Sequence, residues 1–299
     1  MIDHAGSSAR GQVRSRYEDF IASHIPSDDA VRARKGSLFA VADGVGGSEA
    51  GDVASREAAL TLIQCYYESE QRPEKALRKS FQRINHHLFD LSHGGPGGNG
   101  FTRTETTLTG FVLVGDQVHV GHVGDSRVYR IRPERDEIVQ LTRDHSEVAE
   151  LARMGVLTAD EARRHPRRNI ITRSLGSQFA VNADFRTETV SPGDVFILCT
   201  DGLWEPVDEK EMIAIVRENE AEEACTQLIQ LALHRETTDN LSVQIVKVLE
   251  LEERATEPSF RATARSFLQR SLGLLRGSGR PPAQALAGDR RARHIPMGG

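Results

Sequence analysis

The chain has 299 residues, 38% of them hydrophobic and 27% charged, a composition that is ordinary for a globular protein with a large core. Its formal net charge of -5 argues against nucleic acid as the main partner. The three cysteines form no C-x-x-C pair, which argues against a disulfide framework or a zinc site. No segment resembles a signal peptide or a membrane span, so we expect a cytoplasmic protein.

Two pairs of helices are predicted by the spacing of apolar residues. In the first pair, one helix carries its apolar face from Ala54 to Cys65, and the next runs from Pro73, a favoured first-turn residue, to Leu88. The second pair begins after Asp208, which has Glu211 three residues on as a capping-box partner. Its second helix carries its apolar face over residues 224–231.

Strands are predicted between the helix pairs. "TLTGFVLV" and "QVHVGHV" flank Gly115-Asp116, a two-residue hairpin signal, and "RVYRI", "VFILCT" and "LSVQIVKV" follow. Because "VFILC" is apolar at every position, we expect both faces of that strand to be covered. The order of elements predicts an α+β fold, a four-layer α-β-β-α sandwich of two antiparallel β-sheets flanked by antiparallel helix pairs.

Two further segments have a different character. Residues from about 144 to 184 interrupt the strands with short polar helices, "SEVAELARMG" and "TADEARRH", and are predicted to form an insertion over one edge of the core. From about residue 252 to residue 299 the chain is rich in arginine and its last part has the composition of a disordered tail. Residues 260–275 have helical apolar spacing with interspersed arginines, which suits an anionic membrane surface, a partner protein, or packing back on the domain.

Acidic residues recur at the ends of the predicted strands. They are Glu18 and Asp19 in "YED", Asp43 in "FAVADG", Asp125 in "HVGDSR", Asp201 in "FILCTDG" and Asp239 in "TTDN". Each one alone has an ordinary explanation, because Asp accepts backbone hydrogen bonds in turns, and Asp116 in the hairpin is such a case. Together they indicate more, because strand ends that meet at one edge of stacked sheets bring their carboxylates close together.

Carboxylates gathered in this way repel one another unless a cation neutralises them. Oxygen ligands without histidine or thiolate favour Mg²⁺ or Mn²⁺, and two such ions sharing a carboxylate are suited to phosphoryl hydrolysis. Asp43 is then expected to reach the metals, while Gly44 offers its backbone carbonyl and Gly46 and Gly47 let the chain turn.

The sequence resembles the metal-dependent serine/threonine protein phosphatases, the PPM or type-2C family, in their bacterial form. The matching blocks stand in the family's order from about Gly11 to Leu249: "GQVRSRYED", "FAVADGVGG", "TTLTGFVLV", "HVGDSRVYR", "LTRDHS", "ILCTDGLWE" and "TTDNLSVQIV". The resemblance implies a phosphatase domain over residues 1–251, with a flap-like insertion at about 144–184 and a tail at 252–299.

The resemblance also implies roles for individual residues. Four carboxylates match the ligands of two central Mn²⁺ or Mg²⁺ ions: Glu18, Asp43, Asp201 and Asp239. Asp43 is the bridging ligand and Gly44 contributes its carbonyl. Asp19 holds water in the same shell, Asp125 helps to bind a third, weaker ion, and Arg14 grips the substrate phosphate. Arg14, Asp43 and Asp201 are thereby the expected catalytic residues.

The implied activity is hydrolysis of phosphoserine and phosphothreonine in proteins by a metal-activated water, opposing a bacterial serine/threonine kinase in signal transduction. We expect a monomer. Three positions depart from the family pattern: Tyr17 replaces an Asn, Val45 stands where some members have a His, and Glu105 lies in a block that is usually glycine-rich. The altered "YED" and "RTETT" blocks and the basic tail keep open the alternative of a weakly active or inactive phosphoprotein-binding regulator. A phosphatase for non-protein phosphomonoesters is a further alternative.

Several other residues are expected to be structural or simply solvated. His145 and His165 lie in or beside the insertion, and Trp204 is expected to pack in the core. Arg167 and Arg168 are expected on a solvated face of the insertion.

Overall fold

The computed structural model describes residues 1–45, 50–94 and 103–252, without the side chains of residues 159 and 160. Met1–Ala255 form one compact unit. Gly46 and Gly47, most of the glycine-rich sequence "SHGGPGGNG" at 92–100 and the predicted tail after residue 252 lie outside the described residues. No helix of the described residues is both long enough and apolar enough to span a bilayer.

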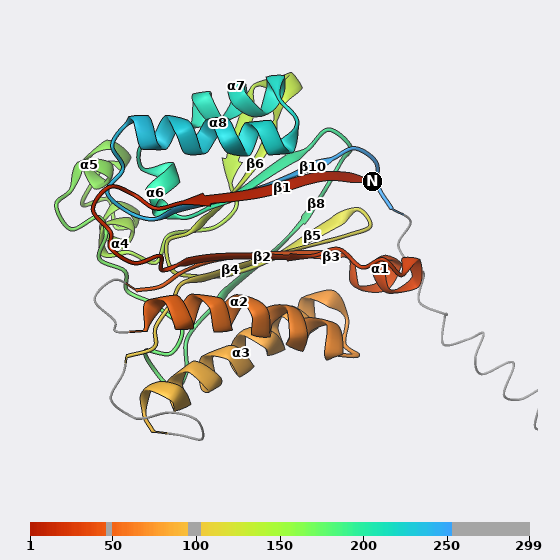
Figure 1. Cartoon of the computed structure of the whole chain (residues 1–299), viewed down its shortest axis with the longest axis horizontal. Coiled ribbons are helices and arrows are strands. Elements are labelled where there is room, and N and C mark those ends of the chain that lie inside the picture. The colour runs from red at the N-terminus through yellow and green to blue at the C-terminus, as the bar shows by residue number, and fades with distance from the viewer. Residues whose placement is uncertain (46–49, 95–102, 253–299) are drawn as a thin grey trace, which may run out of the picture. The chain divides into compact units, whose positions relative to one another are not determined.

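Two five-stranded antiparallel sheets form the centre of the unit. Sheet A has the order β1-β10-β9-β6-β7 and sheet B the order β2-β3-β4-β5-β8. The strands are β1 (Ile2–Ala9), β2 (Asp19–His24), β3 (Ser37–Asp43), β4 (Leu108–Val114), β5 (Gln117–Val123), β6 (Arg127–Arg132), β7 (Glu137–Gln140), β8 (Asp184–Thr189), β9 (Val195–Cys199) and β10 (Leu241–Val248). The sheets stack on each other between two layers of helices (Figure 1), which confirms the predicted four-layer sandwich.

The helices of the outer layers are the predicted antiparallel pairs. The α-helices are α1 (Asp29–Lys35), α2 (Gly51–Glu68), α3 (Pro73–Ser92), α4 (Glu147–Arg153), α5 (Ala159–Arg164), α6 (Asp201–Trp204), α7 (Glu209–Glu218) and α8 (Ala221–His234). Helices α2 and α3 cover sheet B, and α7 and α8 cover sheet A (Figure 1). Pro73 opens α3, and Asp208 and Glu211 form the predicted capping box at the start of α7.

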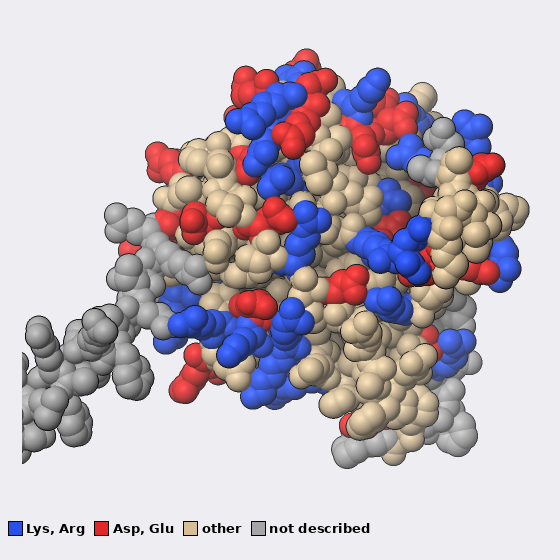
Figure 2. Space-filling model, turned by 180° about the vertical axis from the view of Figure 1, so that it is seen from behind, with Lys and Arg blue, Asp and Glu red and all other residues tan. Residues whose placement is uncertain are grey.

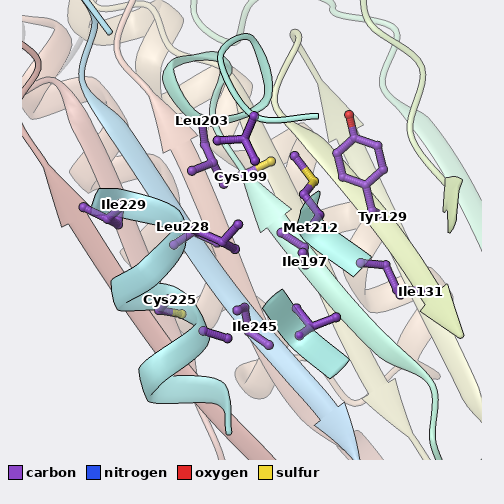
Figure 3. Close-up of a cluster of buried hydrophobic side chains, with 14 of the residues drawn as sticks. Tyr129, Ile131, Ile197, Cys199, Leu203, Met212, Cys225, Leu228, Ile229 and Ile245 are labelled. Atoms are coloured by element: carbon purple, nitrogen blue, oxygen red, sulfur yellow. The ribbon is translucent and has the colours of Figure 1, made fainter. Parts of the chain in front are cut away.

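Three apolar layers hold the sandwich together. The middle layer lies between the sheets and includes Phe39, Phe111 and Phe196, all fully buried. Below sheet B, the small residues Ala54 and Ala58 of α2 let the helix approach the strands closely. Above sheet A, side chains of α7 and α8 pack on β6, β9 and β10 (Figure 3). Every residue of β9 is buried, as its uninterrupted apolar sequence predicts.

The strands that the sequence pattern did not indicate are mostly edge strands. β1 contains glycine, serine and histidine, yet it pairs with β10 along its whole length, from Ile2 opposite Val248 to Ala9 opposite Leu241. β7 and β8 are the edges of sheets A and B at the other side, and their residues are largely half-buried or exposed. Edge strands bury one face incompletely, so their sequences need no regular apolar alternation.

The middle layer yields a stability prediction. Phe111→Ala should lower the free energy of unfolding by about 3–5 kcal/mol, because it leaves a cavity between rings of the two sheets. The Phe111 ring centroid lies 4.8 Å from that of Phe196 and 6.1 Å from that of Phe39. Denaturant unfolding followed by circular dichroism measures the loss. As a control, Val53→Ala on the exposed face of α2 should change the value by less than about 0.5 kcal/mol.

Candidate metal centre

The acidic residues of sheet B meet where β2 begins and β3 ends. Asp19 and Asp43 are direct partners in the antiparallel register of these two strands. The amide of Gly44 donates to the carbonyl of Glu18 at 3.0 Å, which keeps the two acidic segments paired beyond the strands. Thr107, the residue before β4, fixes the backbone of Asp43, accepting from its amide through Oγ1 at 2.9 Å. The sheet therefore places two carboxylates side by side.

The acidic residues of sheet A lie at the same end of the sandwich. Asp201 follows β9, and Asp239 precedes β10, the antiparallel neighbour of β9. Asp125 lies in the turn that leads from β5 in sheet B to β6 in sheet A. Because β6 also pairs with β9, with Arg127 opposite Cys199, that turn reaches the start of α6. Both sheets therefore place their acidic residues at the same edge of the sandwich.

Two side-chain contacts join the halves of this cluster. Thr200 donates from Oγ1 to Asp19 Oδ2 at 2.8 Å, so a residue of sheet A fixes a carboxylate of sheet B. Arg14 donates to Asp239 Oδ2 at 2.7 Å and lies 3.6 Å from Glu18 Oε2. Glu18 thus lies beside Arg14, and its pKa is raised by burial and by the charge of Asp239 and lowered by that of Arg14, with a net rise. All eight residues proposed from the sequence thus belong to one region of the fold.

The buried carboxylates perturb one another's titration. Burial, together with the charges of Asp19, Asp201 and Asp125, raises the pKa of Asp43 well above its ordinary value. Burial and the neighbouring acids likewise raise the pKa of Asp201. Burial raises the pKa of Asp19 to about 6 and that of Asp125 to about 7. Carboxylates in this condition are stabilised by a cation that neutralises them.

The donor atoms fit hard divalent ions. Asp19 Oδ1 and Asp201 Oδ1 are buried oxygens that accept no hydrogen bond from the part of the chain that the structure describes. Buried polar atoms without a partner are rare and call for a ligand. In that same part of the chain, no three His, Cys, Asp or Glu side chains are arranged closely enough to hold a metal ion as they stand. The argument that these residues suit divalent ions therefore rests on the buried oxygens and their mutual repulsion. All the donor atoms are oxygens, which Mg²⁺ and Mn²⁺ prefer.

The glycines after Asp43 and Asp201 serve close packing. A Cβ on Gly44 would lie 2.4 Å from the backbone of Gly51 at the start of α2. A Cβ on Gly202 would lie 2.1 Å from the carbonyl oxygen of Asn240. Both Asp-Gly pairs therefore let a neighbouring segment approach the acidic edge. From the sequence, Gly44 was expected only to leave its carbonyl accessible, so this close packing is an additional reason for a glycine there.

The sequence analysis missed the residues that support the Asp125 turn. The indole of Trp204 donates to the carbonyl of Asp125 at 3.1 Å, so Trp204 does more than the predicted packing. The guanidinium of Arg127 lies 3.4 Å from the Trp204 ring centroid and pairs with Asp144 at 2.6 Å. Arg127 follows Asp125 by two residues, but nothing in the sequence indicates its partners.

His145 is structural, as expected. It is 1% exposed, donates from its amide to the carbonyl of Gly124 at 2.7 Å, and accepts through Nδ1 from the amide of the same residue at 3.1 Å. It therefore ties the base of the predicted flap to the turn that carries Asp125.

Two of the three departures from the family pattern leave the acidic edge intact. Tyr17 is 40% exposed, and burial of part of its ring raises the pKa of the phenol. Glu105 is buried but has partners, since it accepts from Arg103 at 2.8 Å and from Ser174 Oγ at 3.1 Å. The extra acid therefore does not add an uncompensated charge beside Thr106.

The raised pKa of Asp125 predicts a pH dependence of stability in EDTA. A carboxyl group whose folded-state pKa, about 7, exceeds its ordinary value of 3.8 stabilises the protein at acid pH, and this contribution is lost as the pH rises through about 7. Asp125→Asn should therefore match wild type near pH 4 and exceed it by roughly 1–3 kcal/mol near pH 8, measured by denaturant unfolding. Asp116→Asn, in the exposed hairpin, is the control. An advantage of the variant that grew towards acid pH would contradict this origin.

Comparison with known families places this arrangement among characterised proteins. The family described as "Protein phosphatase 2C" matches residues 3–241. The "Serine/threonine phosphatase stp" of Listeria innocua is 33% identical over 244 residues, covering 80% of this chain and 92% of that protein. "Protein phosphatase PhpP" of Streptococcus pneumoniae is 31% identical over 249 residues, covering 80% of this chain and 95% of the other.

Solved structures show the same fold. The catalytic domain of the serine/threonine protein phosphatase PstP, solved in complex with two manganese ions, superposes with a TM-score of 0.69 at 29% identity, covering 83% of this chain and 99% of that one. Stp1 of Staphylococcus aureus gives a TM-score of 0.73 at 28% identity, with 84% and 96% covered. By its sequence match and its layered fold, this chain belongs to the protein phosphatase 2C family.

Proposed function

We propose that this protein hydrolyses phosphoserine and phosphothreonine in proteins with the help of two divalent cations, and that it opposes a bacterial serine/threonine kinase. The observation that carries the proposal is the burial of mutually repelling carboxylates from both sheets at one edge. Such an arrangement is relieved either by protons or by bound cations, and at neutral pH bound divalent cations would neutralise it, which supports a metal-dependent activity. The two manganese ions in the structure of the PstP catalytic domain support the same metal count.

We infer the ligand set from the family resemblance and from the placement of these residues at one edge of the two sheets. Glu18, Asp43, Asp201, Asp239 and the carbonyl of Gly44 would hold the two ions, and Asp43 would be the shared ligand. When bound, the ions supply Lewis acidity and make a water nucleophilic at neutral pH. Asp19, fixed by the Thr200 hydroxyl, would orient that water through its free Oδ1. Asp125 would help to bind a third, weaker ion.

Arg14 is suited to binding the substrate phosphate. Its guanidinium contacts Asp239 and Glu18, which hold it over the acidic edge, while 37% of its side chain stays exposed. The planar fork can engage two phosphate oxygens at once. Its positive charge would offset the charge on the phosphoryl oxygens as the bond to serine or threonine breaks.

Other proposals concern the setting of the reaction. We infer a cytoplasmic monomer that acts in signal transduction on phosphoproteins. The Arg-rich tail, which lies outside the described residues, is proposed to contact an anionic membrane surface or a partner protein. The alternative of an inactive phosphoprotein-binding regulator is favoured if calorimetric titration finds fewer than two tightly bound Mn²⁺ ions and no turnover.

Loss of a central carboxylate should abolish activity. Asp43→Asn and Asp201→Asn should each lower the rate of phosphate release from a phosphothreonine peptide to below about one thousandth of the wild-type rate, because metal stabilisation is worth several kcal/mol. EDTA should have the same effect on wild type, and added Mn²⁺ should reverse it. Asp116→Asn, the same change at an exposed hairpin position, should keep full activity. Full activity of either Asp43→Asn or Asp201→Asn would contradict the ligand assignment.

Substitutions of Arg14 should reveal whether its planar guanidinium binds the substrate phosphate. Arg14→Lys keeps the charge but loses the fork, so kcat/KM for the phosphopeptide should fall roughly ten- to a hundredfold, the effect of losing one or two charge-assisted hydrogen bonds. For Arg14→Ala, kcat/KM for the phosphopeptide should fall further. The bound Mn²⁺ count, measured by calorimetry, should stay at wild-type level in the Lys variant. If Arg14→Lys lost a metal ion instead, Arg14 would be a support for the ligands rather than a phosphate contact.

A further inference from the structure

A groove separate from the metal centre lies between α3 and the segment 179–185 that leads into β8. Its volume is about 410 Å³, and we call it the α3 groove. It is lined on the helix side by Arg78, Phe81, Gln82, Asn85 and His86. The other wall consists of residues 180–183 and Phe185. None of the lining residues belongs to the acidic edge, so the proposed phosphatase mechanism does not account for this groove.

One buried residue fixes the wall segment. Asn85 is 2% exposed, and its side chain makes three hydrogen bonds to the backbone of residues 176–179, which lead into the wall. Its Nδ2 donates to the carbonyls of Gln178 and Phe179, each at 3.0 Å, and its Oδ1 accepts from the amide of Gly176 at 3.0 Å. Because the segment is clamped from within, its shape exists before any partner arrives, which lowers the entropic cost of binding.

The clamp holds a phenylalanine out in solvent. Phe179 is 63% exposed, although its ring stacks on His86 at 4.9 Å and meets Phe89 edge-on at 5.7 Å. Deeper in the groove, Phe185 packs edge-on against Phe81 at 5.5 Å. An aromatic side chain that is fixed and exposed beside an apolar groove is typical of an interaction surface.

The helix that forms one wall of the groove carries several cations. The guanidinium of Arg78 lies 4.2 Å from the Phe185 ring centroid and pairs with Glu74 at 3.5 Å. Lys75, Lys79 and Arg83 are exposed on the same helix and form no ion pair with another described residue. Figure 2 shows Lys and Arg side chains interspersed with Asp and Glu on the face seen from behind. The chain as a whole carries a net charge of -5, so this concentration of cations on α3 is local.

We propose that the α3 groove docks an acidic segment of a partner protein, with one aromatic or aliphatic side chain inserted between Phe179 and Phe185. The aromatic side chains of the groove account for the anchor, and the cations of α3 account for acidic residues on either side of it. The volume accommodates one large side chain. Exposed cations beside the groove also speed association with an acidic partner. The site would bring a partner to the phosphatase without using the metal centre.

The test uses the full chain in EDTA, so that the metal centre attracts no acidic ligand. The probe is a fluorescein-labelled peptide of Asp and Glu residues that carries one central Phe, followed by fluorescence anisotropy. Saturable binding is expected, weakened roughly tenfold or more by Phe→Ser in the peptide and by added salt. In the protein, Phe179→Ser and Arg78→Glu should each weaken binding to a similar extent.

Matched controls separate docking from folding and catalysis. Lys210→Glu makes the same type of change on α7, in the opposite outer layer, and should bind the probe like wild type. All the variants should keep the wild-type unfolding midpoint and, with Mn²⁺, the wild-type turnover of a small phosphopeptide. Because binding is measured in EDTA, failure of the proposed phosphatase activity would leave this test intact.

Three results would overturn the proposal. The first is absence of probe binding, or binding that neither Phe179→Ser nor Arg78→Glu weakens. The second is binding to phosphatidylglycerol vesicles, lost in the same variants, with none to the peptide, which would make the groove a membrane contact. The third is self-association that Phe179→Ser abolishes, which would make the occupant a second copy of this chain.

Discussion

The repulsion among carboxylates buried at one edge of the sandwich is the constraint on which the rest of the structure depends. Asp19 and Asp43 are adjacent in sheet B, and Asp125 and Asp201 raise the pKa of Asp43 from the other side. The apolar layers must hold these groups together against their charge until cations arrive. A large, well-packed core between the sheets is therefore a requirement of the site as well as of the fold.

The sequence was sufficient to predict the parts of the fold that have strong local patterns. The helix pairs and the strand β9 follow from apolar periodicity and capping residues, and the acidic edge follows from acids at strand ends. Edge strands such as β1 were not predicted, because they are stabilised by pairing with a distant strand rather than by their own pattern. Trp204 and Arg127 were missed for a similar reason, since their contacts at Asp125 depend on how two sheets meet.

The hydroxyl of Thr200 shows, for a single atom, which contacts could not be predicted from the sequence. Its place directly before Asp201 indicates that it lies near the site, but its hydroxyl belongs functionally to Asp19, a residue 181 positions away in the chain. Only the stacking of sheet A on sheet B brings the two together. The glycine of each Asp-Gly pair is a similar case. The backbone of another segment leaves no room for a side chain there, and the sequence pattern does not reveal that segment.

The same Thr200 hydroxyl makes one carboxylate sensitive to the spacing of the two sheets. A displacement of one sheet along the other would stretch this single bond and rotate Asp19 before either sheet lost its own ladder of hydrogen bonds. In the proposed metal centre, this change would weaken ion binding while the secondary structure remained intact. If Asp19 supports ion binding as proposed, activity would be lost on warming at a lower temperature than that at which the fold melts.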